Sequence, residues 1–187
     1  MGKSTAAEIL AKRGAKVSDS DQLARELVEP GQPALAEIVE VFGDGVLRED
    51  GWLDRAKVGE LVFGDSAARE KLEGILHPRI RDVRQARFDG WAAAGEWLAV
   101  AVIPLLFETR AEASFDRIVC VACSPEAQRE RLRERGWSDD QISSRLEAQM
   151  AVDEKMKRSN HVVWTDGTIE AHAAQWDALL SSWDVEA

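Results

Sequence analysis

Short apolar runs of strand length, alternating with helical patterns, place the strongest constraint on how this chain can fold. The second and third runs stop at prolines, Pro104 and Pro125. Continuous runs of this kind are typical of strands that are buried on both faces of a parallel sheet. The alternation of strands with helices predicts an α/β fold with right-handed crossovers. The strand candidates are residues 15–19, 97–103, 117–123 and 162–164.

Helical patterns fill the segments between these strands. Residues 4–12 carry apolar Ala6, Ile9 and Leu10 at helical spacing, and we expect Gly14 to end that helix in the left-handed conformation. A helical stretch from 22 to 90 is interrupted by Gly- and Pro-containing breaks at 30–31, 43–45 and 50–51. The remaining predicted helices are residues 126–136, 139–150 and 169–183.

The composition is that of a globular protein with an acidic balance. Hydrophobic residues make up 45% and charged residues 31% of 187 residues, which suits one domain with a sizeable core. A formal net charge of −10 disfavours nucleic acid and anionic membranes as partners. No apolar run approaches the roughly 20 residues of a membrane span, and no leader is evident. Two cysteines without a disulfide framework fit a reducing compartment, so we expect a cytoplasmic protein. We also expect a monomer or a weak homo-oligomer.

The string Gly2-Lys3-Ser4-Thr5 matches the end of a G-x-x-x-x-G-K-[ST] phosphate-binding loop. In such a loop backbone N–H groups and a helix N-terminus bind phosphates, the Lys reaches the β- and γ-phosphates, and the hydroxyl ligates Mg²⁺. The alternative is an ordinary helix start with Ser4 or Thr5 at the N-cap. These four residues fit both interpretations.

Two carboxylates, Asp19 and Asp21, stand at the end of the first strand candidate. Residues two apart on a strand point to the same face, and ligands of open α/β sheets bind at the carboxyl ends of strands. This pair could orient a hydroxyl nucleophile or hold Mg²⁺ through water. The alternative is a solvated turn, because Asp and Ser favour turns.

Arginines are concentrated between residues 125 and 158, where basic and acidic residues are equally numerous. Arg131 and Arg135 are four apart and share a helix face, and Arg145 follows on the next predicted helix. Arginines on a helical hairpin can clamp a nucleoside triphosphate. The alternative is an exposed helix with alternating charges.

Taken together and in order, these segments resemble the dephospho-CoA kinase family over essentially the whole chain. The resemblance implies a P-loop NTPase fold of the nucleoside-monophosphate-kinase-like type, a three-layer α/β/α arrangement with a parallel sheet, a helical CoA-substrate insertion and a small helical lid. The matching segments are residues 2–5 (GKST), 17–21 (VSDSD), 29–35 (EPGQPAL), 51–55 (GWLDR), 77–81 (HPRIR), 103–108 (IPLLFE), 124–128 (SPEAQ), followed by Arg131 and Arg135, and 145–149 (RLEAQ).

The resemblance also implies a division of one kinase domain, residues 1–187. Its core would be 1–50, 95–125 and 159–187, its substrate-binding helical region 51–94, and its lid 126–158. The implied reaction is ATP-dependent phosphorylation of the ribose 3′-hydroxyl of dephospho-CoA, the last step of coenzyme A biosynthesis.

Residue roles follow from the same resemblance. Asp21 would orient or deprotonate the acceptor hydroxyl, and Lys3 would stabilise the transferring charge. Binding of ATP is implied for Gly2, Lys3, Ser4, Thr5, Arg131, Arg135 and Arg145, with Ser4 on Mg²⁺. Binding of the acceptor is implied for Asp19, Asp21, His77, Arg81, Pro104 and Leu105. His77 has a structural alternative, because a residue before proline often marks a helix boundary.

The sequence departs from the family pattern at two places. Roughly 12 residues that carry the first strand and the early loop glycines are missing compared with the family. We expect a start codon placed too late or a truncation rather than a protein that is naturally short, and we expect the chain as written to be impaired. Thr165 stands where the family has an Asn at the nucleotide end. The competing interpretations are a non-catalytic relic that binds CoA-like ligands and a different P-loop small-molecule kinase.

Cysteine, histidine and tryptophan give no further sites. Cys120 and Cys123 form a C-x-x-C string inside a predicted buried strand, so we do not expect a redox or zinc site. The three histidines lack metal-ligand spacing. Trp176 and Trp183, seven apart on the last helix, are predicted to belong to the core.

Overall fold

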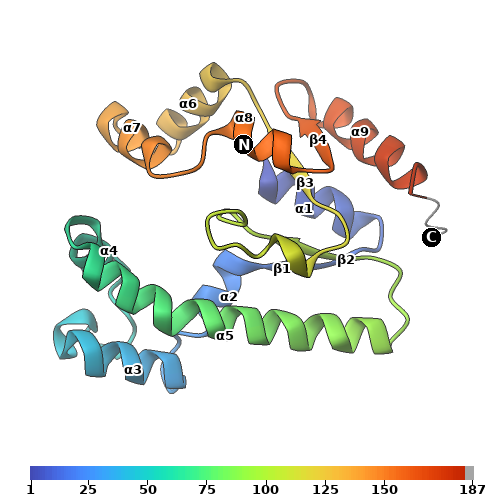
Figure 1. Cartoon of the computed structure of the whole chain (residues 1–187). Coiled ribbons are helices and arrows are strands. Elements are labelled where there is room, and N and C mark those ends of the chain that lie inside the picture. The colour runs from blue at the N-terminus through green and yellow to red at the C-terminus, as the bar shows by residue number, and fades with distance from the viewer. Residues whose placement is uncertain (184–187) are drawn as a thin grey trace. The chain divides into compact units, whose positions relative to one another are not determined.

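The computed structural model describes residues 1–183 and divides into two compact units (Figure 1). The first unit comprises Met1–Val17 and Val102–Ala187, and the second comprises Ser18–Ala101. The chain passes from one unit to the other within strand β1 (Lys16–Asp19) and again within strand β2 (Ala99–Val102). The division of the kinase domain into core, substrate region and lid stays a prediction.

All four predicted strands are present, and they form two two-stranded sheets, β1-β2 and β3-β4. Strand β3 (Val119–Ala122) pairs in parallel with β4 (His161–Trp164), in register from Val119 opposite His161 to Ala122 opposite Trp164. The prediction of strands buried on both faces is wrong in detail. Strand β2 is half-buried throughout, and in β3 only every second residue is buried. Each strand has one neighbour in its described sheet, so each is an edge strand with less cover.

Helices of the first unit pack around the β3-β4 pair. Helix α9 (Ile169–Ser181) contacts β4, α8 (Val152–Arg158) contacts β3, and α1 (Lys3–Lys12) contacts α9. An ion pair between Arg13 and Asp177 joins the C-terminal end of α1 to α9. Two further helices, α6 (Pro125–Glu134) and α7 (Asp139–Glu147), pack on each other as a hairpin.

The end of α1 confirms the role predicted for Gly14. Its φ of 88° lies in the left-handed region. Its N–H donates to Ala11 O, and the Ala15 N–H donates to Leu10 O. This pair of bonds is the Schellman arrangement, which satisfies carbonyls that a helix end would otherwise leave unbonded. The chain can then turn directly into β1.

The second unit is built on one long helix, α5 (Ser66–Ala93), drawn in green in Figure 1. Helices α2 (Ser20–Glu26), α3 (Pro33–Phe42) and α4 (Arg55–Gly64) all contact α5. The predicted breaks are confirmed, because Gly31, Gly43 and Gly51 all have positive φ. The buried core of this unit consists of Val28, Ala34, Ile38, Val46, Val58 and Ile75.

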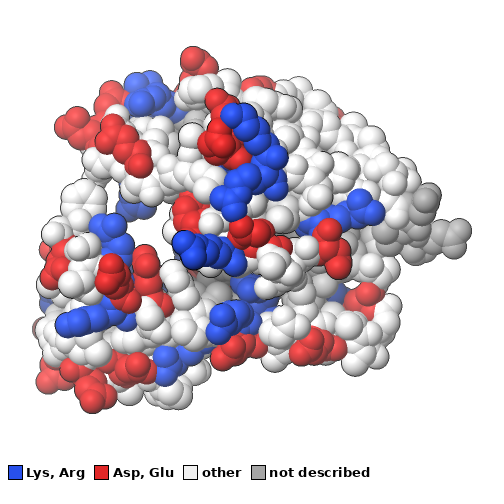
Figure 2. Space-filling model, viewed as in Figure 1, with Lys and Arg blue, Asp and Glu red and all other residues white. Residues whose placement is uncertain are grey.

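Charges of both signs are interspersed on the face shown in Figure 2. Several of them are paired within a unit, such as Arg87 with Glu26 and Arg79 with Glu37. Within residues 1–183, no helix combines the length and the apolar character that a membrane span requires.

Candidate active site

The phosphate-loop segment, residues 2–5, forms the start of α1. Gly2 is the N-cap, in the left-handed conformation with φ 75°, and the helix begins at Lys3. The alternative interpretation with Ser4 or Thr5 at the N-cap is therefore wrong, because both lie inside the first turn. Among the described residues, no side chain caps this helix start. The N–H groups of the first turn lack intrahelical acceptors, and together with the helix dipole they favour an anion.

Thr165, just beyond β4, packs directly against Gly2. A Cβ added to Gly2 would lie 3.0 Å from Thr165 Cγ2 and 3.3 Å from its Oγ1. Thr165 is buried, and both its N–H and its hydroxyl donate to the carbonyl oxygen of Ala122, at 2.9 and 3.2 Å. Position 2 thus requires glycine both for its positive φ and for this close approach.

Arg131 extends from α6 to the same threonine. Its Nη1 donates to Thr165 Oγ1 at 2.9 Å, and its Nη2 donates to the Thr165 carbonyl oxygen. The beginning of α6 is held nearby, because the Ser124 N–H donates to both carboxylate oxygens of Asp166, at 2.9 and 3.0 Å. The start of α1, the turn after β4 and the α6–α7 hairpin therefore meet at Gly2, Thr165 and Arg131. The sequence indicated Thr165 only as a departure, and its bridging position was missed.

The other two predicted clamp arginines are exposed on the α6–α7 hairpin. Arg135 is the C-cap residue of α6, and the guanidinium carbon of Arg145 lies 4.3 Å from the ring centroid of Trp137. Arg133 forms an ion pair with Asp139 across the turn between the helices. The alternating-charge interpretation thus holds for Arg133, while Arg131 makes the contact to Thr165.

Asp19 and Asp21 lie at the strand-to-helix transition of the second unit. The argument that they share one strand face is wrong, because β1 ends at Asp19 and α2 begins at Ser20. Asp19 is the N-cap of α2, and its Oδ1 accepts from the N–H groups of Asp21 and Gln22 at 2.8 and 3.4 Å. Asp21 is exposed in the first helical turn, and its carboxylate is open to a ligand.

His77 and Arg81 are exposed on α5, one turn apart. The alternative of a helix boundary at His77 is wrong, because α5 continues through Pro78. One turn further along, Arg84 is buried, with 7% of its surface exposed. Burial, assisted by the charge of Arg81, lowers the pKa of Arg84. The sequence analysis missed the burial of Arg84. The available signal was its place among the apolar positions of the helix.

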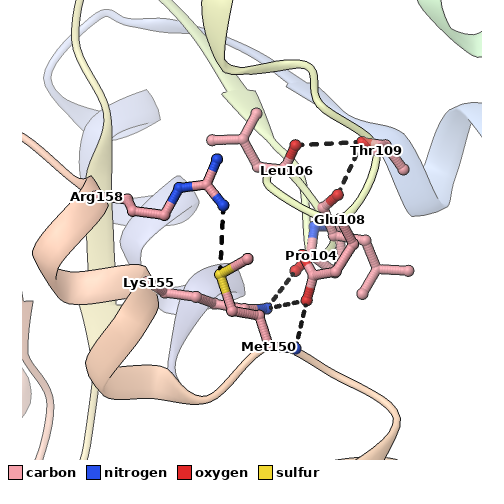
Figure 3. A network of polar contacts seen from close by, with 8 residues as sticks. Pro104, Leu106, Glu108, Thr109, Met150, Lys155 and Arg158 are labelled. Atoms are coloured by element: carbon pink, nitrogen blue, oxygen red, sulfur yellow. Dashed lines mark hydrogen bonds and ion pairs between the residues drawn. The ribbon is translucent and has the colours of Figure 1, made fainter.

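Pro104 and Leu105 begin the turn that follows β2, and both are half-buried. The same turn carries Glu108, whose side chain is 22% exposed and accepts from Lys155 Nζ at 2.8 Å. The Met150 N–H donates to the same carboxylate oxygen, Oε1, at 2.9 Å (Figure 3). The roles of Glu108 and Lys155 were also missed. The sequence carried no signal for them, because the burial of Lys155 depends on the packing of α8 on β3.

Glu108 makes the stability of the protein depend on pH. Burial acts to raise the pKa of Glu108, but hydrogen bonds from Lys155 and the Met150 N–H outweigh it, so the net pKa lies below its usual value. The stabilisation is complete above the unfolded carboxyl pKa of about 4.3, and it disappears as the pH falls through the folded pKa. At neutral pH we expect Glu108→Gln to lower the free energy of unfolding by about 1–2 kcal/mol.

Urea unfolding of the wild type and Glu108→Gln across the acid range tests this prediction. The difference in free energy of unfolding should shrink steadily below a pH of about 4. Glu154→Gln is the control, since it breaks only the exposed pair with Lys157 on the same helix, α8. That control should change stability little at any pH. A difference between wild type and Glu108→Gln that is independent of pH would contradict the assignment.

The cysteines and tryptophans have structural surroundings. Cys120 and Cys123 are buried free thiols, and burial raises the pKa of Cys120 against the charges of Lys155 and Lys3. Trp176 is confirmed as a core residue, and its Nε1 donates to His172 Nε2 at 3.1 Å. Trp183 is half-buried and donates to His161 Nε2 at 3.2 Å.

Comparisons with known proteins agree with this arrangement. The sequence model of the family described as dephospho-CoA kinase matches residues 1–171. A dephospho-CoA kinase of Anaeromyxobacter dehalogenans is 48% identical over 181 residues, covering 96% of this chain and 86% of the relative. A dephospho-CoA kinase of Bacillus thuringiensis subsp. konkukian is 40% identical over 185 residues, covering 98% of this chain and 92% of the relative.

Solved structures share the fold. A crystal structure of a Thermus thermophilus protein superposes with a TM-score of 0.82 at 32% identity, covering 97% of this chain and 91% of that chain. A Campylobacter jejuni dephospho-CoA kinase superposes with a TM-score of 0.71 at 23% identity, covering 98% of this chain and 93% of that chain. The predicted α/β fold is therefore confirmed. Because the family match spans the start of α1, β4 and the α6–α7 hairpin alike, the chain belongs to the dephospho-CoA kinase family.

Proposed function

We propose that this chain transfers the γ-phosphoryl group of ATP to the ribose 3′-hydroxyl of dephospho-CoA and so completes coenzyme A. The observation that carries the proposal is the cluster of Gly2, Thr165 and Arg131, which joins an uncapped helix start to an arginine-bearing hairpin. In a member of this family, such a cluster suits a nucleoside triphosphate. The alternative of a non-catalytic relic has no observation in its favour.

The nucleotide would bind at residues 2–5 and under the hairpin. N–H groups of the first turn of α1 would bind phosphate oxygens, and Lys3 would stabilise the charge that moves with the transferred group. Arg131 already contacts Thr165 beside Gly2. Arg135 and Arg145 would add positive charge when the hairpin closes over the nucleotide.

Magnesium would sit beside the phosphates, with the hydroxyl of Ser4 as its protein ligand. Ser4 is exposed in the first turn of α1, one residue after Lys3. Mg²⁺ commonly takes one or two protein oxygens and completes its shell with phosphate oxygens and water. Within residues 1–183 no cluster of three or more His, Cys, Asp or Glu side chains could hold a metal ion. A hydroxyl next to bound phosphates therefore fits Mg²⁺ without such a cluster.

The acceptor would bind to Asp21, Asp19, His77 and Arg81 and to the Pro104–Leu105 turn. Asp21 would accept a hydrogen bond from the 3′-hydroxyl and take its proton as the hydroxyl oxygen bonds to the γ-phosphorus. The bond from that phosphorus to the bridging oxygen breaks, and ADP leaves. Phosphoryl transfer needs little covalent help, so the main contribution of the protein is positioning.

The test is a coupled ADP-release assay on the purified protein. Dephospho-CoA should support turnover, whereas shikimate and nucleoside monophosphates should not. Identification of CoA by mass spectrometry excludes futile ATP hydrolysis as the source of ADP. Turnover of another acceptor at comparable kcat/KM would assign the chain to a different reaction. Binding of dephospho-CoA without Mg²⁺-ATP binding would instead support a non-catalytic protein.

A further inference from the structure

A charged side chain with little exposure lies inside the first unit. Lys155 on α8 has 7% of its surface exposed, and lysines are almost never buried to this degree unless they are paired. Its Nζ donates to Glu108 Oε1 at 2.8 Å and to the Pro104 carbonyl oxygen at 3.3 Å. The second contact is informative, because it ties a buried charge directly to the backbone of the Pro104–Leu105 turn.

Glu108 extends this contact to the α6–α7 hairpin. Its Oε1 also accepts from the N–H of Met150, which lies between α7 and α8. Figure 3 shows Lys155 and the Met150 N–H approaching the turn from the same side. We call this set, Pro104, Glu108, Met150 and Lys155, the Glu108–Lys155 junction. One carboxylate therefore holds both the turn after β2 and the exit of the hairpin.

Within the turn itself the bonds are local. The Thr109 N–H and hydroxyl both donate to the Leu105 carbonyl oxygen, at 3.0 and 2.8 Å, and the Ala111 N–H donates to Leu106 O at 3.0 Å. Such bonds define the shape of the turn but leave its placement open. Contacts from a distant segment place it, and they come from Lys155 and from Arg158, whose guanidinium carbon lies 4.5 Å from the Phe107 ring centroid.

A partly buried ion pair of this kind adds little net stability compared with an apolar pair. Desolvation of the two charges offsets much of their attraction, and an apolar pair of similar size is often as stable. Its effect is geometric, because the ammonium group must meet one carboxylate oxygen and one carbonyl at once. The junction therefore restricts where the turn can lie.

We propose that Lys155 is a positioning residue for the acceptor, acting through the Glu108 carboxylate and the Pro104 carbonyl to fix the Pro104–Leu105 turn. The inference rests on the proposed function, in which this turn contacts dephospho-CoA. The role is one of positioning, because the Lys155 ammonium group is engaged by the Glu108 carboxylate and the Pro104 carbonyl oxygen. Its loss should weaken acceptor binding and leave the nucleotide site at the start of α1 intact.

The test compares Lys155→Met with Lys157→Met. The control removes a lysine of the same helix that is exposed and pairs only across the surface with Glu154. Amide hydrogen exchange of residues 105–111 is the first readout, because it requires no activity. In Lys155→Met that exchange should rise about tenfold or more, and in Lys157→Met it should match the wild type.

Kinetics are the second readout. We expect the KM for dephospho-CoA to rise about tenfold or more in Lys155→Met, with the affinity for Mg²⁺-ATP within about twofold of the wild type. Lys155→Arg, which keeps the charge and the donors, should recover part of the loss. A merely structural lysine would lower the active fraction, and hence kcat, at unchanged KM. If Lys155→Met fails to fold, Glu108→Gln takes its place, since it keeps an acceptor for the Met150 N–H.

Unchanged exchange of residues 105–111 overturns the proposal, and so does an unchanged KM for dephospho-CoA. A separate result would affect the proposed function alone. If the wild type does not turn over dephospho-CoA but exchange rises in Lys155→Met, the junction holds the turn and the acceptor is a different molecule.

Discussion

Replacing Asp21 with Asn should lower the kcat for CoA formation by about 10²–10⁴-fold, with little change in Mg²⁺-ATP affinity. Asn is nearly isosteric but cannot take the proton of the acceptor hydroxyl. Asp21 is exposed in the first turn of α2, and it is Asp19 whose side chain caps that helix. The substitution therefore leaves the cap in place, and we expect the melting temperature to stay close to that of the wild type.

Steady-state kinetics with CoA detection and calorimetry with Mg²⁺-ATP measure the two effects. Glu40→Gln is the matched control, because it removes one exposed negative charge from α3 in the same unit. The control should retain wild-type kcat. Asp21→Asn with kcat within about threefold of the wild type would show that Asp21 does not handle the acceptor hydroxyl.

Local sequence signals predicted the elements well. Residues 4–12 have helical spacing and Gly14 follows them, and the structure contains α1 with a Schellman end at that glycine. The four strand candidates are all strands in the structure, and Gly31, Gly43 and Gly51 interrupt the helices where expected. Each of these features depends on the conformation of a few neighbouring residues, and that conformation follows from the local residue pattern.

Predictions that depended on where an element ends were less accurate. The same-face argument for Asp19 and Asp21 failed because the chain changes from strand to helix between them. The alternative of a helix boundary at His77 failed because α5 accommodates Pro78 within a helix that the rest of the unit packs against. Tertiary packing can override the local preference of a proline.

Contacts across long separations were outside the reach of pattern analysis. Thr165 meets Gly2 and Arg131, and Lys155 meets Glu108 and Pro104. No spacing rule links positions so far apart. A lysine in a charge-rich helix is predicted to be solvated, and burial of Lys155 became apparent only when α8 was placed on β3.

In the proposed function, these contacts would let one hairpin act at both the nucleotide and the acceptor. Its beginning is held through Ser124 and Asp166, next to Thr165 and the start of α1. Its exit is held through Met150 and Glu108 at the turn after β2. We therefore expect substitutions at Thr165 to alter nucleotide affinity first, and substitutions at Glu108 to alter acceptor affinity first.

The start of α1 gives the second large effect. Lys3→Met should lower kcat by about 10²–10³-fold and also raise the KM for ATP, because an ammonium at the phosphates acts in both the ground state and the transition state. Lys3 is the first residue of α1 and is half-buried, while Lys12 is exposed in the last turn of the same helix. Lys12→Met is therefore the control for loss of one lysine from α1. The Lys12→Met protein should keep the wild-type kcat, and its free energy of unfolding should fall by at most about 1 kcal/mol through the helix dipole.

Single-turnover kinetics at saturating Mg²⁺-ATP separate the effect of Lys3→Met on chemistry from its effect on binding. A Lys3→Met protein that retains its single-turnover rate would remove Lys3 from the catalytic role and leave it as a nucleotide-binding residue.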